Sequence, residues 1–192
     1  MSLLPVKRIS TAQPTLEGAG VALRRAFGFG QTSDYDPFLL LDDFRNDDPD
    51  KYRAGFPWHP HRGIETITYV LAGKVAHGDS LGHSGAIGAG DVQWMTAGAG
   101  VLHKEYHEQE FSKRGGPFEM VQLWVNLPAR HKLTPANYQA ITAGQMGKVT
   151  LPNNAGLVNV IAGKFNEQAG PATTFTPVNM FDIRLNAGGA LT

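Results

Sequence analysis

Short runs of alternating apolar and polar residues recur along the chain, and glycine- and proline-rich turns separate them. The runs are rich in Val, Ile, Thr, Phe and Tyr, which favour strands, while 23 glycines and 12 prolines supply frequent turns. We predict strands at residues 38–44, 65–73, 74–80, 89–98, 101–107, 120–127 and 156–165. Their order suggests a meander with few helices, so the pattern predicts an all-β sandwich or barrel.

The stretch ARHKLTPANYQAI, residues 129–141, breaks this pattern because it lacks sustained alternation and contains a proline. We interpret it as a connector with one helical turn. Beyond it, VNVIAG and NMFDIRL again have the character of strands.

The composition limits the function classes that need to be considered. A chain of 192 residues with 42% hydrophobic and 18% charged residues is long enough for one domain with a substantial core. The 17 basic and 17 acidic side chains balance, so no electrostatic reason exists to expect nucleic-acid binding. The chain has no cysteine, so any metal must be held by nitrogen and oxygen ligands.

The start of the chain, MSLLPVKRIS, lacks the continuous apolar core of a secretory signal. No later run approaches the ~20 apolar residues that a membrane helix needs. The absence of cysteine fits a reducing compartment. The sequence therefore predicts a cytoplasmic protein without a membrane partner.

The stretch HPHRGIE, residues 59–65, places three ionisable groups at the start of an apolar run. Alternate side chains of an extended chain point to the same face, so His59, His61 and Glu65 are expected to share a face with Ile67 and Tyr69. A lone His-x-His pair is more often a surface turn than a metal site. The prediction of a metal site therefore needs a second cluster.

The second cluster is LHKEYHE, residues 102–108, in which His103 and Glu105 also alternate. It lies about forty residues after the first cluster, and closure of a β-barrel would bring two such strands together with their inward faces meeting. Three imidazoles and one carboxylate suit a divalent first-row metal and would leave positions for water, substrate or dioxygen. The two clusters together indicate an open metal site.

The stretches HPHRGIETITYVLAG, DSLGHSGAIGAGDVQWMTAGAGVLHKE and QLWVNLP resemble the pirin family, a branch of the cupin superfamily. The resemblance is densest from Asp36 to Pro128, and FDIRLNAGG resembles the strand that opens the family's second cupin domain. It implies a bicupin-type fold of jelly-roll β-barrels, with the second barrel incomplete in this chain. We accordingly expect an N-terminal metal-binding cupin domain at 1–130, and a connector with the first strands of a C-terminal cupin domain at 131–192.

The resemblance also implies the ligands. The family's four iron ligands fall on His59, His61, His103 and Glu105, and we expect Fe²⁺ or another divalent first-row metal there. Many cupins instead use the glutamate of the first motif, here Glu65, which we expect beside the ligands, orienting their imidazoles. The remaining histidines, His77, His83, His107 and His131, are expected at the surface or in hydrogen bonds.

Two functions are compatible with these ligands. Pirins similar to this chain include quercetin 2,3-dioxygenases, which implies an Fe²⁺-dependent oxygenase opening a flavonol ring with dioxygen, with Glu105 accepting the proton of the substrate hydroxyl. The alternative is a non-enzymatic, redox-sensitive iron-binding regulator that acts on a protein partner, as a transcriptional cofactor does. A small aromatic substrate would be the partner in the first case. The incomplete second barrel is also expected to leave an apolar face open to a protein partner or to self-association.

The glycines of GAIGAGD and TAGAGV superficially suggest a phosphate-binding loop. A dinucleotide motif must open a helix after a strand, whereas these glycines lie between predicted strands. We interpret them as turns.

Overall fold

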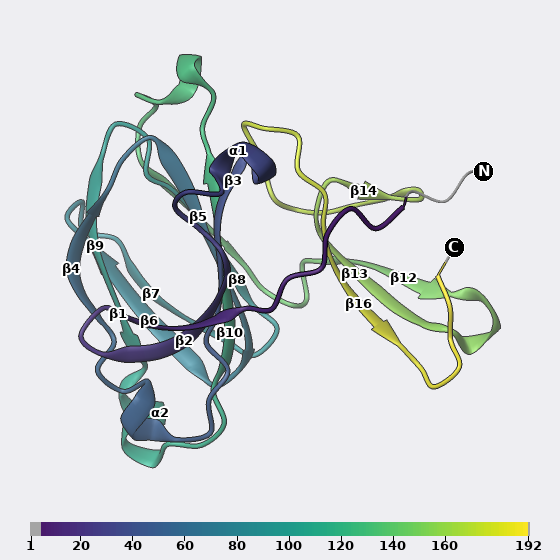
Figure 1. Ribbon diagram of the computed structural model, residues 1–192, viewed down its shortest axis with the longest axis horizontal. Coiled ribbons are helices and arrows are strands. Elements are labelled where there is room, and N and C mark those ends of the chain that lie inside the picture. The colour runs from purple at the N-terminus through teal and green to yellow at the C-terminus, as the bar shows by residue number, and fades with distance from the viewer. Residues whose placement is uncertain (1–4, 192) are drawn as a thin grey trace.

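A computed structural model describes residues 5–191, so residues 1–4, which belong to the stretch MSLLPVKRIS, and residue 192 lie outside the described residues. Figure 1 shows a barrel of two sheets beside a smaller C-terminal unit. The described residues are mainly strands, as the alternation predicted, and the architecture is the predicted cupin fold. None of the helices in this part of the chain is long and apolar enough to cross a bilayer.

A seven-stranded antiparallel sheet forms one wall of the barrel. In spatial order its strands are β1 (Gln13–Glu17), β2 (Val21–Phe27), β3 (Phe38–Asp43), β10 (Glu119–Asn126), β5 (Ile64–Ala72), β8 (Val92–Thr96) and β11 (Asn137–Ile141). The prediction of a meander is wrong, because β10 lies between β3 and β5 and hydrogen-bonds to both. The strands β1 and β2 were not predicted.

The opposite wall is a four-stranded antiparallel sheet. Its strands, again in spatial order, are β4 (Phe56–His61), β9 (Val101–His107), β6 (Lys74–Asp79) and β7 (Ser84–Gly88). Between the two walls, one end of the barrel is filled by an apolar cluster that includes Phe44, Val70, Phe111, Phe118 and Met120. The helix α2 (Gln109–Arg114) contributes Phe111 to this cluster, so it closes that end.

The predicted extended run at residues 59–73 is two strands in different walls. Gly63 adopts a φ of 69°, a conformation that favours glycine, and its N–H donates to the carbonyl of Gly98 at 2.7 Å. This turn moves the chain from β4 in one sheet to β5 in the other. The parity that relates His59 and His61 therefore does not extend to Glu65.

The C-terminal unit is smaller than a barrel. It contains a three-stranded sheet of β12 (Gly147–Leu151), β13 (Gly156–Ala162) and β16 (Met180–Leu185), with the hairpin β14 (Lys164–Phe165) and β15 (Gln168–Ala169). Both VNVIAG and NMFDIRL lie in these strands, as predicted. The predicted binding of a partner or a second copy by this unit stays a prediction.

The connector at 129–141 begins with the predicted single turn, the 3-10 helix η2 (Ala129–His131). It ends, however, as β11, which pairs with β8 and so extends the barrel sheet beyond the expected boundary at residue 130. The other short helices are α1 (Thr32–Tyr35), η1 (Pro49–Lys51) and η3 (Pro152–Asn154). The division of the chain into domains at 130 and 131 stays a prediction.

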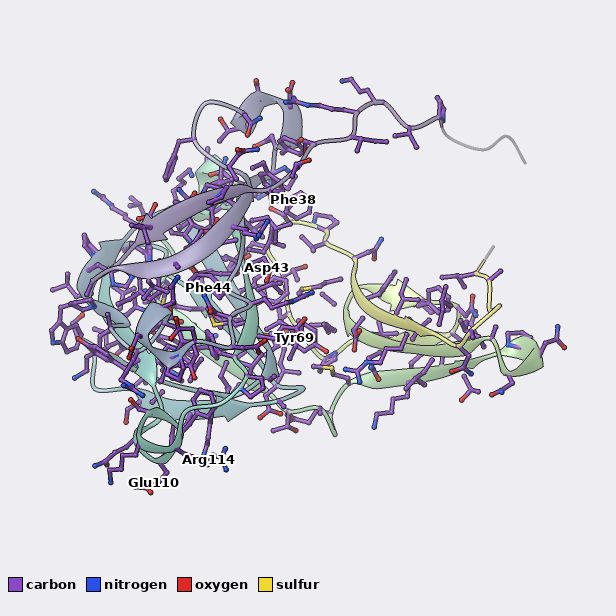
Figure 2. All side chains as sticks on the ribbon, turned by 60° about the horizontal axis from the view of Figure 1, so that its bottom comes forward. Phe38, Asp43, Phe44, Tyr69, Glu110 and Arg114 are labelled. Atoms are coloured by element: carbon purple, nitrogen blue, oxygen red, sulfur yellow. The ribbon has the colours of Figure 1, made fainter. Side chains whose placement is uncertain are left out.

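The outer face of the seven-stranded sheet packs against the C-terminal unit. Ile67 and Trp94 of the barrel share an apolar cluster with Ile161 and Val178. In Figure 2, Tyr69 lies at the side of the barrel that faces this unit, and its hydroxyl donates to Asp182 of β16 at 2.9 Å. Burial and this carboxylate raise the pKa of Tyr69 to about 12. The phenol is therefore a donor at neutral pH.

Tyr69→Phe is expected to lower the free energy of unfolding by about 1–3 kcal/mol, because it removes a hydrogen bond to a charged group between the two parts of the fold. Urea unfolding followed by circular dichroism measures this difference. Tyr106→Phe is the matched control, since that residue is 37% exposed on β9. Equal effects of the two substitutions would contradict a stabilising role for the Tyr69 hydroxyl.

Candidate metal centre

Three histidines converge between two neighbouring strands of the four-stranded sheet. His59 of β4 and His103 of β9 are directly paired in the antiparallel register, and His61 follows His59 on the same face of β4. The ring centroids lie 4.3 Å apart for His59 and His103, 4.8 Å for His61 and His103, and 4.9 Å for His59 and His61. One nitrogen from each ring can be chosen so that all three lie within 4.8 Å of one another. The structure thus brings the three predicted histidines together.

The protonation of these rings suits metal binding. Burial, together with the neighbouring histidines, lowers the pKa of His61 and of His103 to about 3 each, so both rings are neutral at neutral pH. His59 Nδ1 lies 2.7 Å from the carbonyl oxygen of Pro57, which can only accept a hydrogen bond. In the neutral ring this contact places the proton on Nδ1, so that Nε2 carries the lone pair that can bind a metal.

His103 provides a direct test of whether a metal fits the site. Its side chain is buried, with 2% exposure, and neither ring nitrogen has a hydrogen-bond partner. A buried polar group without a partner costs about 1–3 kcal/mol, and coordination to a metal would remove that cost. The unpaired nitrogens of His103 and the convergence of three imidazoles fit a divalent first-row metal.

Glu105 lies in the barrel interior, two residues after His103 on the same face of β9. Its Oε1 accepts a hydrogen bond from the Thr68 hydroxyl at 3.2 Å, and its Oε2 accepts one from the Gln122 amide at 3.0 Å. The close group of candidate ligands contains the three histidines and not Glu105. The role of Glu105 as a fourth ligand therefore stays a prediction.

Glu65 does not lie beside the three histidines. It points to the outer face of the seven-stranded sheet, where it is opposite Thr96 and accepts a hydrogen bond from that hydroxyl at 2.8 Å. Burial raises the pKa of Glu65 above its ordinary value. The structure does not bring Glu65 to the histidines, because the turn at Gly63 places the two groups in different sheets. The predicted orienting contact to the imidazoles is absent among the hydrogen bonds of the described residues.

The remaining histidines divide into two kinds. His83 is exposed and bonds to Asp79 at 2.8 Å, as predicted for a surface histidine, and His131 packs against Phe175 at the surface. His77 and His107 instead lie on strand faces directed into the barrel, and each has a buried nitrogen without a partner. Both residues are only partly buried, and neither ring forms a hydrogen bond with the described residues, so the expected hydrogen bonds are not found.

A cavity of about 670 Å³ opens onto His59 and His61. Its walls include the apolar side chains Phe29, Leu40, Trp58 and Trp124, while His59, His61, Glu105 and Gln122 supply polar groups. This volume and mixture are typical of small-molecule sites. The sequence analysis did not identify Phe29 and Gln122 as residues of the site. Gln122 could have been noticed, because it is a polar residue among the apolar residues in the middle of β10.

Comparison with known sequences identifies relatives over most of the chain. Residues 20–125 match the family described as Pirin. A protein of Pseudomonas aeruginosa named "Putative quercetin 2,3-dioxygenase" is 47% identical over 89% of this chain and 61% of its own length. A pirin-like protein of Caulobacter vibrioides is 43% identical over 98% of this chain and 67% of its own. The chain thus spans about three fifths to two thirds of the length of these relatives.

Solved structures of similar proteins share the fold of this chain. The quercetin 2,3-dioxygenase of Acinetobacter baumannii superposes with a TM-score of 0.81 at 46% identity, covering 90% of this chain and 61% of that one. A bacterial pirin of Escherichia coli, in complex with nickel(II), superposes with a TM-score of 0.54 at 27% identity, covering 71% of this chain and 57% of that one. The residues matched to the Pirin family, 20–125, include all three histidines.

Proposed function

Because the chain belongs to the pirin family, we propose that it is a metal-dependent dioxygenase of the quercetin 2,3-dioxygenase type. The observation that carries this proposal is the cavity of about 670 Å³ that is lined by His59 and His61, two of the three converging histidines. A flat aromatic substrate such as a flavonol fits its apolar walls. A regulator that acts only through a protein partner has no need of such a cavity, so the alternative function has less support.

The metal would be held by His59, His61 and His103, with Glu105 as the candidate fourth ligand. We propose Fe²⁺, while the nickel(II) in the Escherichia coli relative supports a site that accepts other divalent first-row ions. When bound, such an ion supplies Lewis acidity and the redox chemistry for reaction with dioxygen.

The chain itself contributes a proton acceptor. Glu105 lines the cavity beside the histidines and is 6% exposed, so it can meet a substrate hydroxyl shielded from bulk water. We propose that its carboxylate accepts the proton of the flavonol hydroxyl. The apolar walls orient the rings and exclude water from them.

Anaerobic reconstitution with Fe²⁺, followed by mixing with a flavonol and dioxygen, tests the function. We expect oxygen uptake with release of carbon monoxide from the opened heterocycle. A protein that binds iron fully and consumes no oxygen with a series of flavonols would reject the dioxygenase and favour the iron-binding regulator.

Glu105→Gln is expected to lower turnover by about 10²–10⁴-fold, because the amide cannot accept the substrate proton. Glu65→Gln is the matched control, since Glu65 is also a buried carboxylate but lies on the outer face of the seven-stranded sheet, where it bonds to Thr96. Rates per bound metal, determined by elemental analysis of each variant, separate proton transfer from metal loss. An equal or larger loss in Glu65→Gln would favour the ligand pattern of other cupins.

A further inference from the structure

A chain of hydrogen bonds connects the wall of the cavity to Glu105. Trp124 Nε1 donates to Gln122 Oε1 at 3.2 Å, and Gln122 Nε2 donates to Glu105 Oε2 at 3.0 Å. Thr68 lies directly opposite Gln122 on β5, receives a second contact from Nε2 at 3.3 Å, and donates its hydroxyl to Glu105 Oε1. Gln122, Thr68 and Glu105 are all at least nine-tenths buried. The network therefore joins the two walls of the barrel where water has little access.

The orientation of the Gln122 amide follows from Trp124. The indole N–H can only donate, so it must face the oxygen of the Gln122 amide. The amide nitrogen of Gln122 is then directed to Glu105 and cannot be exchanged for the oxygen without losing both contacts. As a result, each carboxylate oxygen of Glu105 accepts one hydrogen bond and retains a lone pair.

Trp124 also contacts His61, one of the three histidines. Its ring meets His61 edge-on, with centroids 4.9 Å apart and an interplanar angle of 78°. One side chain thus contacts a predicted metal ligand directly and holds Glu105 through the amide. Groups that fix ligands in this way commonly change metal affinity by about 10–100-fold when they are removed.

We propose that Gln122 and Trp124 are positioning residues that orient the Glu105 carboxylate toward the ion held by the three histidines. The proposal rests on the proposed function, because it requires a metal at that site. Gln122 acts through Glu105, and Trp124 acts through Gln122 and His61.

Cobalt(II) titration of the purified protein tests this proposal without an activity assay, with visible absorption reporting both affinity and ligand geometry. Gln122→Met keeps the side-chain length but removes the donor, and is expected to weaken cobalt binding by about 10-fold or more and to shift the absorption bands. Trp124→Phe keeps an aromatic ring against His61 but removes the N–H, so a smaller change in the same direction is expected. Gln139→Met is the control, because that amide bonds to Thr173 away from the histidines.

A double variant separates action through Glu105 from a general packing effect. If Gln122 acts through Glu105, Gln122→Met adds little further loss of affinity to Glu105→Gln, whereas independent effects would add. Wild-type affinity and absorption in both Gln122→Met and Trp124→Phe would overturn the proposal while leaving the proposed function intact. Full additivity in the double variant would also overturn it. A wild-type protein that binds no cobalt and no iron would instead reject the metal site and, with it, the proposed function.

Discussion

His103→Ala is expected to abolish most metal binding and, with it, the flavonol-dependent uptake of oxygen. His103 is the most buried of the three histidines, at 2% exposure, and its ring is close to both others. Its removal takes away the imidazole that lies close to both others and leaves His59 and His61 with Glu105 as the candidate further ligand, so the affinity for the ion should fall steeply. Elemental analysis of the purified variant after reconstitution with Fe²⁺ measures the loss.

The barrel itself is expected to remain folded in this variant. The apolar cluster around Phe44 and Phe118 does not include the histidine. Circular dichroism therefore should show an unchanged strand content. His131→Ala is the control, because His131 lies in η2 outside the group of ligands. A folded His103→Ala protein with the wild-type metal content would mean that the metal binds elsewhere.

The pairing of the two histidine clusters could be predicted from the sequence because it depends on local alternation. His59 and His61 alternate in β4, and His103 follows the same rule in β9. Closure of the barrel then aligned the strands, with His59 opposite His103. Parity within one strand is a property of a few residues, so no distant contact was needed to predict it.

The position of Glu65 could not be predicted in the same way. Its distance from His61 in the sequence fits a continuous strand, but the hydrogen bond from Gly63 to Gly98 interrupts the strand between them. That interruption depends on a turn formed by residues about 35 positions away. The contacts of Gln122 could not be predicted for a related reason. The strand β10 lies between β3 and β5, although it is distant from both in the sequence. Alternation gives the faces of a strand but not its neighbours.

Trp94→Ala is expected to cost about 3–5 kcal/mol of the free energy of unfolding, the typical loss for a buried tryptophan. Trp94 is fully buried on β8, in the middle of the apolar cluster between the seven-stranded sheet and the C-terminal unit. The substitution leaves a cavity bounded by residues of both parts, including Ile67 and Ile161. Urea unfolding followed by circular dichroism measures the loss, and Trp58→Ala, at a residue 53% exposed, should cost much less.

The shape of the same unfolding curve tests how the two parts of the fold depend on each other. If the barrel and residues 147–185 form one cooperative unit, Trp94→Ala should lower the urea midpoint of a single transition without changing its slope. The shared cluster and the bond between Tyr69 and Asp182 both favour this result, because neither part can unfold without exposing the other's apolar surface. Two separate transitions, with only the first shifted by the substitution, would show that the C-terminal unit is held weakly against a barrel that is stable alone.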